Sequence, residues 1–150
     1  MSFDLGPAIL FCPADRPERF RKALDRADAV ILDLEDAVAP ADKRAARGVL
    51  IESELDPARI IVRVNPVGTA EFDADIQTLS QTDYRTVMIA KAESPKRIAK
   101  VDRRFRLIAL LETAKGVTHA DRIAACDNVV ALMWGAEDLV ASVHIEFISR

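Results

Sequence analysis

Residues 29–40 read AVILDLEDAVAP, a run of branched aliphatic residues followed by three carboxylates. The first part is typical of a strand that is buried on both faces of a parallel sheet. Pro40 then opens a helical pattern, so Asp33, Glu35 and Asp36 fall at a strand-to-helix corner. In β/α proteins the carboxyl ends of the strands are where ligands bind and chemistry occurs. This corner is therefore the first candidate for a functional site.

Five further aliphatic runs predict strands, at residues 8–12, 59–64, 86–90, 106–111 and 129–134. Helical patterns lie between them, over 14–24, 41–54, 72–79 and 94–101, and around 120–124. No two-residue hairpin signal such as Asn-Gly joins two strands, which favours a parallel sheet. The alternatives are an open doubly wound sheet and a TIM barrel. A repeat of roughly 25 residues favours the barrel, although a whole one needs about 250 residues. No glycine-rich phosphate-binding fingerprint supports the open sheet.

The composition narrows the function classes. A net charge of −3 with interspersed signs argues against nucleic-acid binding, which usually needs a basic stripe. No apolar run reaches the roughly 18 residues of a membrane span, and the N-terminus lacks the layout of a secretory signal. We therefore expect a cytoplasmic protein without a membrane partner. Cys12 and Cys126 form no metal-binding spacing, and we expect both to be core residues.

Polar residues follow all six predicted strands. In chain order they are Asp15 and Arg16, then Asp33, Glu35 and Asp36, then Arg63 and Asn65, then Lys91 and Glu93, then Glu112, then Glu137 and Asp138. Any one of them has an ordinary explanation as a helix cap or surface charge. Their recurrence predicts a rim of acids and cations that a ligand or metal would balance.

The residue types on this rim limit the chemistry. Carboxylates without cysteine or histidine partners suit a hard cation such as Mg²⁺. Arginine suits a substrate carboxylate or phosphate. A metal and an arginine beside a carbonyl can stabilise a developing enolate, as carbon–carbon bond cleavage requires. The residues alone predict metal-assisted chemistry on an anionic oxo-acid or thioester.

Six motifs, in order, resemble the citrate lyase beta subunit-like (CitE-like) proteins of the HpcH/HpaI aldolase superfamily. The motifs are FCPADRPERF at 11–20, VILDLEDAV at 30–38, RVNP at 63–66, MIAKAES at 88–94, LETA at 111–114 and MWGAEDL at 133–139. The resemblance implies an α/β (β/α)8 TIM barrel, with residues 1–150 forming a single lyase domain that contains the first six β/α units. It also implies a Mg²⁺-dependent carbon–carbon lyase acting on a 3-hydroxyacyl-CoA thioester of the citryl, malyl or citramalyl type.

The resemblance also assigns roles to residues. Glu112 and Asp138 would be the metal ligands and, with Arg63, the catalytic residues. Arg63 would bind oxygens of the oxo-acid and steady the enolate, and the backbone amides of 135–137 would hold the substrate carboxylate. Remaining roles are supportive. Arg16, and less certainly Lys22, would reach the CoA, while Asp33, Glu35, Asp36 and Lys91 would organise the surroundings of the metal. The substrate-binding set is thus Arg63, Glu112, Gly135, Ala136, Glu137 and Arg16.

Other residues near these motifs have ordinary structural interpretations. Glu35 is as well explained by an ion pair with Arg63 or Lys91. We expect Lys43 and Arg47 to be solvated helix charges, with support of the acidic corner as the alternative. We expect Trp134 to pack in the core beside the site rather than to stack on substrate.

The resemblance is incomplete at the C-terminus. The last two barrel strands, the closing helices and the C-terminal lid that can donate an acid to a neighbouring subunit have no counterpart, and residues 143–150 depart from the family pattern. Either the chain is part of a longer enzyme, or it is a truncated, non-catalytic protein that binds oxo-acid and metal or acts as a scaffold. By resemblance we expect a homo-oligomer, a trimer or hexamer.

Overall fold

The computed structural model describes residues 4–141 and contains one parallel six-stranded sheet with strand order β1-β2-β3-β4-β5-β6. The strands are β1 (Ile9–Pro13), β2 (Ala29–Asp33), β3 (Ile60–Val64), β4 (Thr86–Ile89), β5 (Arg106–Leu111) and β6 (Val129–Trp134). Each predicted strand is present, with ends within a residue or two of those expected. The sequential order is that of a barrel, because a doubly wound sheet reverses its order at a switch point.

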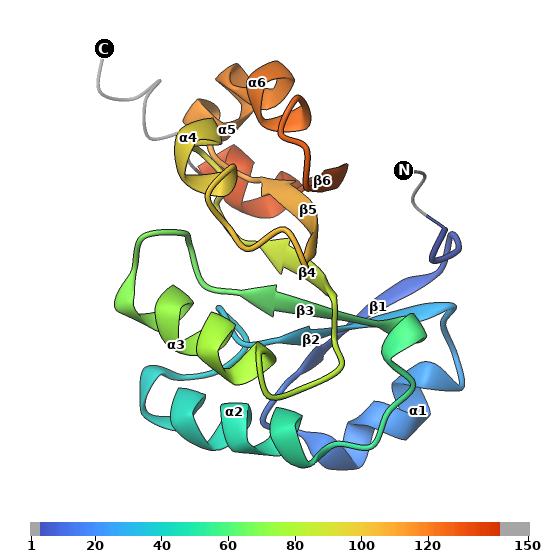
Figure 1. Cartoon of the computed structure of the whole chain (residues 1–150). Coiled ribbons are helices and arrows are strands. Elements are labelled where there is room, and N and C mark those ends of the chain that lie inside the picture. The colour runs from blue at the N-terminus through green and yellow to red at the C-terminus, as the bar shows by residue number, and fades with distance from the viewer. Residues whose placement is uncertain (1–3, 142–150) are drawn as a thin grey trace.

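Helical segments connect the strands (Figure 1). They are α1 (Phe20–Leu24), α2 (Lys43–Glu52), α3 (Ala70–Leu79), α4 (Pro95–Ile98), α5 (Ala114–Thr118) and α6 (Ala120–Ala124), with 3-10 turns at Pro17–Arg19, Pro40–Asp42 and Pro57–Arg59. Residues 136–141 are also helical. Side-chain caps fix three of the starts, because the hydroxyls of Thr69, Ser94 and Thr113 accept hydrogen bonds from backbone amides of the first turn.

The two faces of the sheet pack against different partners. One face and the helices form the main core, in which Leu32 and Val62 of the strands meet Leu50 and Leu79 of the helices. The other face forms a smaller cluster made mainly of strand residues, including Ile31 and the other residues that alternate with those of the main core. Within residues 4–141 the helical core residues therefore lie on one side of the sheet, as in a barrel wall. This arrangement confirms the predicted TIM-barrel-type fold with six strands.

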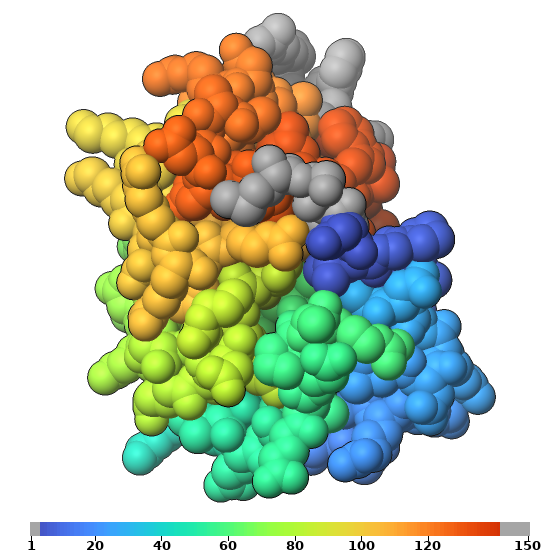
Figure 2. Space-filling view, turned by 45° about the vertical axis from the view of Figure 1, so that its right-hand side comes forward, coloured from blue at the N-terminus to red at the C-terminus, as the bar shows by residue number. Residues whose placement is uncertain are grey.

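The N-terminal segment lies against the β5–β6 end of the molecule (Figure 2). Leu5 packs into the inner cluster, and Asp4 forms an ion pair with Arg106 of β5, with 3.3 Å between Oδ1 and Nη2. This contact links the start of the chain to a strand four places away in the sheet. The sheet is consequently curved, with its inner cluster enclosed at the end opposite to the strand-end rim.

None of the helices in residues 4–141 is both long enough and apolar enough to cross a bilayer. The prediction for Cys12 is confirmed, since its side chain is buried in the main core and burial raises the pKa of its thiol. Cys126 is only partly buried and packs at the edge of that core. His144 and the departing stretch 143–150 lie outside the described residues.

Candidate functional site

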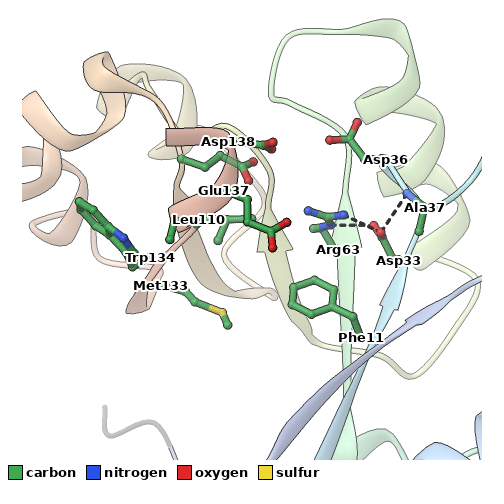
Figure 3. Close-up of a pocket in the computed structure, with 13 residues that line it drawn as sticks. Phe11, Asp33, Asp36, Ala37, Arg63, Leu110, Met133, Trp134, Glu137 and Asp138 are labelled. Carbon is green, nitrogen blue, oxygen red and sulfur yellow. Dashed lines mark hydrogen bonds and ion pairs between the residues drawn. The ribbon is translucent and has the colours of Figure 1, made fainter. Parts of the chain in front are cut away.

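A cavity of about 430 Å³ lies at the carboxyl ends of the strands. Its lining residues are Phe11, Asp33, Asp36, Ala37, Arg63, Leu110, Glu112, Met133, Trp134, Gly135, Ala136, Glu137 and Asp138. The structure thus brings eight of the predicted site residues together in one place. Figure 3 shows two facing walls, with Asp33, Asp36 and Arg63 on one side and Glu137 and Asp138 on the other.

Arg63 forms the centre of the first wall. Its guanidinium donates two parallel hydrogen bonds to Asp33, from Nε to Oδ1 at 2.7 Å and from Nη2 to Oδ2 at 2.6 Å. Glu35 lies 3.4 Å from Nη1, and the ring of Phe11 lies beneath the guanidinium at 5.1 Å. Burial lowers the pKa of Arg63, but the hydrogen bond to Asp33 and the negative charges of Asp33, Glu35 and Glu112 together outweigh it, and the net shift is upward. The side chain is a fixed cation on the cavity wall.

The sequence of the corner explains why Asp33 is ready for Arg63. Asp33 is the last residue of β2, and its carboxylate also accepts the amides of Glu35 at 2.9 Å and Ala37 at 3.2 Å. This Asx-type turn folds the chain back after the strand and satisfies backbone groups locally. Asp33 is buried, so its charge requires both the amides and the guanidinium. The corner therefore holds Arg63 in place.

Lys91 connects the acidic corner to the neighbouring strand end. Its ammonium bonds to the carboxylate of Glu35 and lies 3.1 Å from that of Asp36. Burial raises the pKa of Asp36, but the hydrogen bond from Lys91 and its positive charge outweigh it and leave that pKa below its usual value. Glu35 therefore pairs with both Arg63 and Lys91, which fulfils the ion-pair interpretation. Lys91 itself lines a second cavity on the other side of this corner.

Glu112 is the buried carboxylate of the second wall. It follows β5, its Oε1 accepts the backbone N–H of Lys91 at 2.7 Å, and its side chain is 3% exposed. Burial raises the pKa of Glu112, and the Lys91 amide opposes this shift. A Cβ on Gly135 would lie 2.6 Å from Cβ and 3.0 Å from Oε2 of Glu112. Glycine at position 135 therefore leaves room for this carboxylate at the cavity surface.

The remainder of the second wall is open. Ala136, Glu137 and Asp138 are exposed and belong to the helical residues 136–141, while the amide of Gly135 donates to Leu111 at 3.0 Å. The backbone donors left for an anion are thus those of Ala136 and Glu137, at the start of the helical residues.

Mg²⁺ fits the donor chemistry of this wall. It prefers hard oxygen ligands and is commonly held by one or two carboxylates, with water and substrate filling the other positions. Glu112 and Asp138 line the same cavity. In residues 4–141, no three histidine, cysteine or acidic side chains are grouped so as to hold a metal ion alone. Glu112 and Asp138 are therefore the candidate ligands among these residues.

A buried network behind the first wall was not expected from the sequence. Lys43 donates to the carbonyls of Leu34 at 2.6 Å and Glu35 at 2.8 Å, and it is 8% exposed. Arg47 bonds to the fully buried Asp75 at 2.8 Å. The expectation that Lys43 and Arg47 are solvated charges was therefore wrong. Their partners lie in the loop after β2 and on α3, which favours the alternative, that they support the acidic corner.

Asp75 is the hub of this network. One oxygen accepts from Arg47, and the other accepts both the backbone amide and the side-chain amide of Asn65, at 2.9 Å and 2.8 Å. Burial raises the pKa of Asp75, and these donors oppose the shift. Asn65 follows β3 directly, so the network fixes the loop after Arg63. The sequence signal that could have predicted this network is Asp75 itself, an acidic residue within the apolar pattern of the helix predicted at 72–79.

The structure also shows the outcome of the expectations for Trp134 and Arg16, and it reveals one site residue, Phe11, that the sequence did not single out. Trp134 is 59% exposed and lies on the cavity lining, so the prediction that it packs in the core was wrong. Arg16 has a side chain that is 56% exposed, and it is not among the lining residues of the cavity. Phe11 was missed as a site residue. Its position one residue before Cys12 on the alternating first strand is the signal that could have placed it on the inner face.

Comparison with known protein families gives a match to the model described as HpcH/HpaI aldolase/citrate lyase, over residues 8–147. The chain is 55% identical over 137 residues to a citrate lyase subunit beta-like protein of Mycobacterium tuberculosis, covering 91% of this chain and 50% of that protein. It is 34% identical over 176 residues to an L-malyl-CoA/beta-methylmalyl-CoA lyase of Cereibacter sphaeroides, covering 97% of this chain and 55% of the lyase.

Solved structures of other proteins also resemble this chain. M. tuberculosis CitE in complex with magnesium and pyruvate has a TM-score of 0.88 and 54% identity, covering 92% of this chain and 57% of that one. RipC from Yersinia pestis has a TM-score of 0.75 and 30% identity, covering 91% and 60% of the two chains. The chain spans about half the length of the curated relatives it matches. On the matched residues and the shared fold, the chain belongs to the HpcH/HpaI aldolase/citrate lyase family.

Proposed function

We propose that this chain contributes the metal and oxo-acid site of a Mg²⁺-dependent carbon–carbon lyase that acts on a 3-hydroxyacyl-CoA thioester of the citryl, malyl or citramalyl type. The observation that carries the proposal is one cavity with a fixed arginine on one wall and a buried carboxylate on the other. The solved complex of M. tuberculosis CitE with magnesium, acetoacetate and coenzyme A supports it. Residues 1–150 would form part of a single lyase domain.

Glu112 and Asp138 would hold the metal ion. Glu112 presents a carboxylate whose Oε1 is already fixed by the Lys91 amide, and Asp138 stands exposed on the same cavity wall. Bound Mg²⁺ would act as a Lewis acid toward the oxygens of the oxo-acid. The buried position of Glu112 would limit water around this contact and so strengthen it.

Arg63 would bind the oxo-acid from the opposite wall and steady the enolate that forms when the carbon–carbon bond breaks. Its Nε and Nη2 are occupied by Asp33, so Nη1 is the nitrogen with the weakest protein contact. A cation held rigidly by a buried carboxylate needs little reorganisation as charge develops on the substrate. Asp33, Glu35, Asp36 and Lys91 would maintain this geometry.

The remaining contacts would fix the two ends of the substrate. The amides of Ala136 and Glu137 would hold the substrate carboxylate, and Gly135 would provide the space beside Glu112. Arg16 would reach the CoA from outside the cavity, where its side chain is exposed. By family resemblance the protein would be a homo-oligomer, a trimer or hexamer, and its composition favours the cytoplasm as the place where it works.

A second candidate is a protein that binds metal and oxo-acid without lyase activity. The specific observation in its favour is that Glu112, Asp138 and Arg63, which would bind metal and oxo-acid, line one cavity within these residues. The two candidates differ in whether a thioester is cleaved.

The test is incubation with Mg²⁺ and a panel of citryl-, malyl- and citramalyl-CoA thioesters, followed by detection of free oxo-acid. The lyase proposal predicts release that stops with a chelator and in Glu112→Ala and Asp138→Ala. Binding of oxo-acid without release would support the second candidate. Oxo-acid binding that is unchanged in both variants would overturn the site assignment itself.

A further inference from the structure

Lys91 has a backbone conformation that is unusual for its residue type. Its φ angle is 47°, and among residues 4–141 it is the single non-glycine residue with positive φ. This left-handed region is unfavourable for residues with a Cβ and is normally taken by glycine or asparagine. A strained conformation persists only where surrounding contacts fix it, and such residues concentrate at functional sites.

The hydrogen bonds around Lys91 show what this conformation achieves. The amide of Ala90 donates to Val64 of β3 at 3.2 Å, and the amide of Ala92 donates to Leu110 of β5 at 3.1 Å. Consecutive amides of a regular strand point to opposite sides. Here the Lys91 amide points to Glu112, just beyond β5, so it shares a side with that of Ala92. The Lys91 amide thus follows the regular alternation after Ala90, and the left-handed residue turns the next N–H, that of Ala92, to the same side, so that two successive amides hold this segment against β5 and Glu112.

The Lys91 N–H, held in place on this side, selects between the two oxygens of Glu112. Oε1 accepts it at 2.7 Å. Oε2 lies on the side of Gly135, where a Cβ would be 3.0 Å away, and both residues line the cavity. One oxygen is therefore held by the protein and the other is left for a ligand.

We propose that Lys91 is a positioning residue that orients the Glu112 carboxylate through its left-handed backbone, separately from the contacts of its ammonium with Glu35 and Asp36. The inference deepens the proposed function and rests on it for the metal. The side chain and the backbone of this one residue thus serve different walls of the cavity. The amide fixes the orientation of the Glu112 carboxylate, and the ammonium balances the negative charge of the acidic corner.

Substitutions at position 91 separate these two roles. Lys91→Gly, Lys91→Asn and Lys91→Val all remove the ammonium, but only the first two residue types accept positive φ readily. Because all three variants lose the ammonium equally, the test is the comparison among them, and we expect Mn²⁺, titrated as a spectroscopic substitute for Mg²⁺, to bind Lys91→Gly and Lys91→Asn with similar affinity. Lys91→Val should bind about tenfold more weakly than these two, as for other losses of a group that orients a metal ligand. Equal affinity in all three variants, or an equal loss, would overturn the proposal.

A second readout does not require metal. A backbone amide that donates to a carboxylate has a strong, charge-assisted hydrogen bond, so its proton resonance should lie downfield. The resonance of residue 91 should move upfield in Glu112→Gln and in Lys91→Val, and should stay downfield in Lys91→Gly. An unmoved resonance in Glu112→Gln would overturn the positioning role. If wild type bound no Mn²⁺ while this pattern appeared, the proposed function would fail and the orientation of Glu112 by residue 91 would stand.

Discussion

The two walls of the cavity are built on opposite principles. On the β2–β3 wall, Arg63 and Asp33 are nearly buried and joined by two hydrogen bonds of 2.7 and 2.6 Å. On the β5–β6 wall, Glu112 is buried with one amide bond, whereas Glu137 and Asp138 are exposed (Figure 3). Charges removed from water need partners within the protein, but exposed carboxylates do not. The buried charges of the first wall are balanced within the protein, whereas the second wall has carboxylates left for a ligand.

The difference extends behind the walls. The first is supported by the network in which Asp75 joins Arg47 of α2 to Asn65 after β3, and in which Lys43 holds the loop after β2. The second wall depends on close approach, because Gly135 leaves space for Glu112. Changes to the network behind the first wall should therefore affect mainly stability, and changes to the carboxylates of the second wall mainly ligand binding.

The largest effect is expected from Asp75→Ala, which would leave Arg47 without its buried partner. Removing one member of a buried ion pair costs about 3 kcal/mol or more, so the free energy of unfolding should fall by that amount. Urea unfolding followed by circular dichroism measures it. Asp73→Ala is the matched control, because Asp73 is exposed on the same helix and should change stability little. Equal losses in the two variants would argue against a structural role for the network.

Glu112→Gln, on the second wall, should have the opposite effect to Asp75→Ala: metal binding should weaken while the stability of the fold is retained. The amide is nearly isosteric and its oxygen can still accept from Lys91, so stability should change little. Replacing a residue that merely supports a ligand costs up to about 100-fold in metal affinity, and loss of a direct ligand should cost at least as much, about 2.7 kcal/mol. Calorimetric titration with Mg²⁺ measures this. A variant that retains wild-type affinity would remove Glu112 from the metal site.

Gly135→Ala tests the close approach on the second wall. The added Cβ would lie 2.6 Å from Cβ of Glu112, and such overpacking costs about 1–3 kcal/mol. Gly48→Ala is the control, because Gly48 is inside α2 and no atom lies within 4 Å of the added Cβ. That change should stabilise the chain by about 0.5–1 kcal/mol. Thermal unfolding should move the two variants in opposite directions, and the same direction in both would contradict the close-approach account.

The smallest effect concerns the exposed edge of the first-wall network. The hydrogen bond from Arg47 lowers the pKa of Glu71 below its usual 4.5, and the Glu71 side chain is 47% exposed. A carboxylate with a lowered pKa stabilises the fold above its unfolded pKa, and this contribution is lost as the pH falls through the folded value. Glu71→Gln should therefore cost about 0.2–1 kcal/mol at neutral pH. The difference from wild type should shrink as the pH falls through the lowered folded-state pKa of Glu71, as urea midpoints measured at neutral pH and at successively lower pH would show; a constant difference would rule out the ionic origin.

Sequence patterns predicted the strands well because each is a short aliphatic run, and β2 to β5 are buried on both faces along most of their length. The strand-end rule also placed Asp33, Arg63 and Glu112 in one cavity, since parallel strands end at the same edge. The environment of Lys43 and Arg47 was mispredicted, because their partners depend on how α2 packs against distant elements; Asp75 is 28 residues from Arg47. A local pattern does not contain that information.

Around the second wall, too, local sequence patterns failed to predict features that depend on tertiary contacts. Trp134 was placed in the core because large aromatic residues are usually buried, but the structure exposes it on the cavity lining. Similarly, nothing in the sequence indicates that Lys91 adopts positive φ, because lysine is not a residue type that favours it. Such local exceptions are determined by tertiary contacts and tend to occur at functional sites.

The central claim is that the two walls act together on an oxo-acid with Mg²⁺ between them. Calorimetric titration of oxaloacetate into the chain, with Mg²⁺ or with a chelator, tests it most directly. We predict binding only with Mg²⁺, and its loss both in Glu112→Gln and in Arg63→Lys, which keeps the positive charge but lacks the planar fork. Binding of equal affinity in the chelator, or binding unaffected by either substitution, would contradict the account.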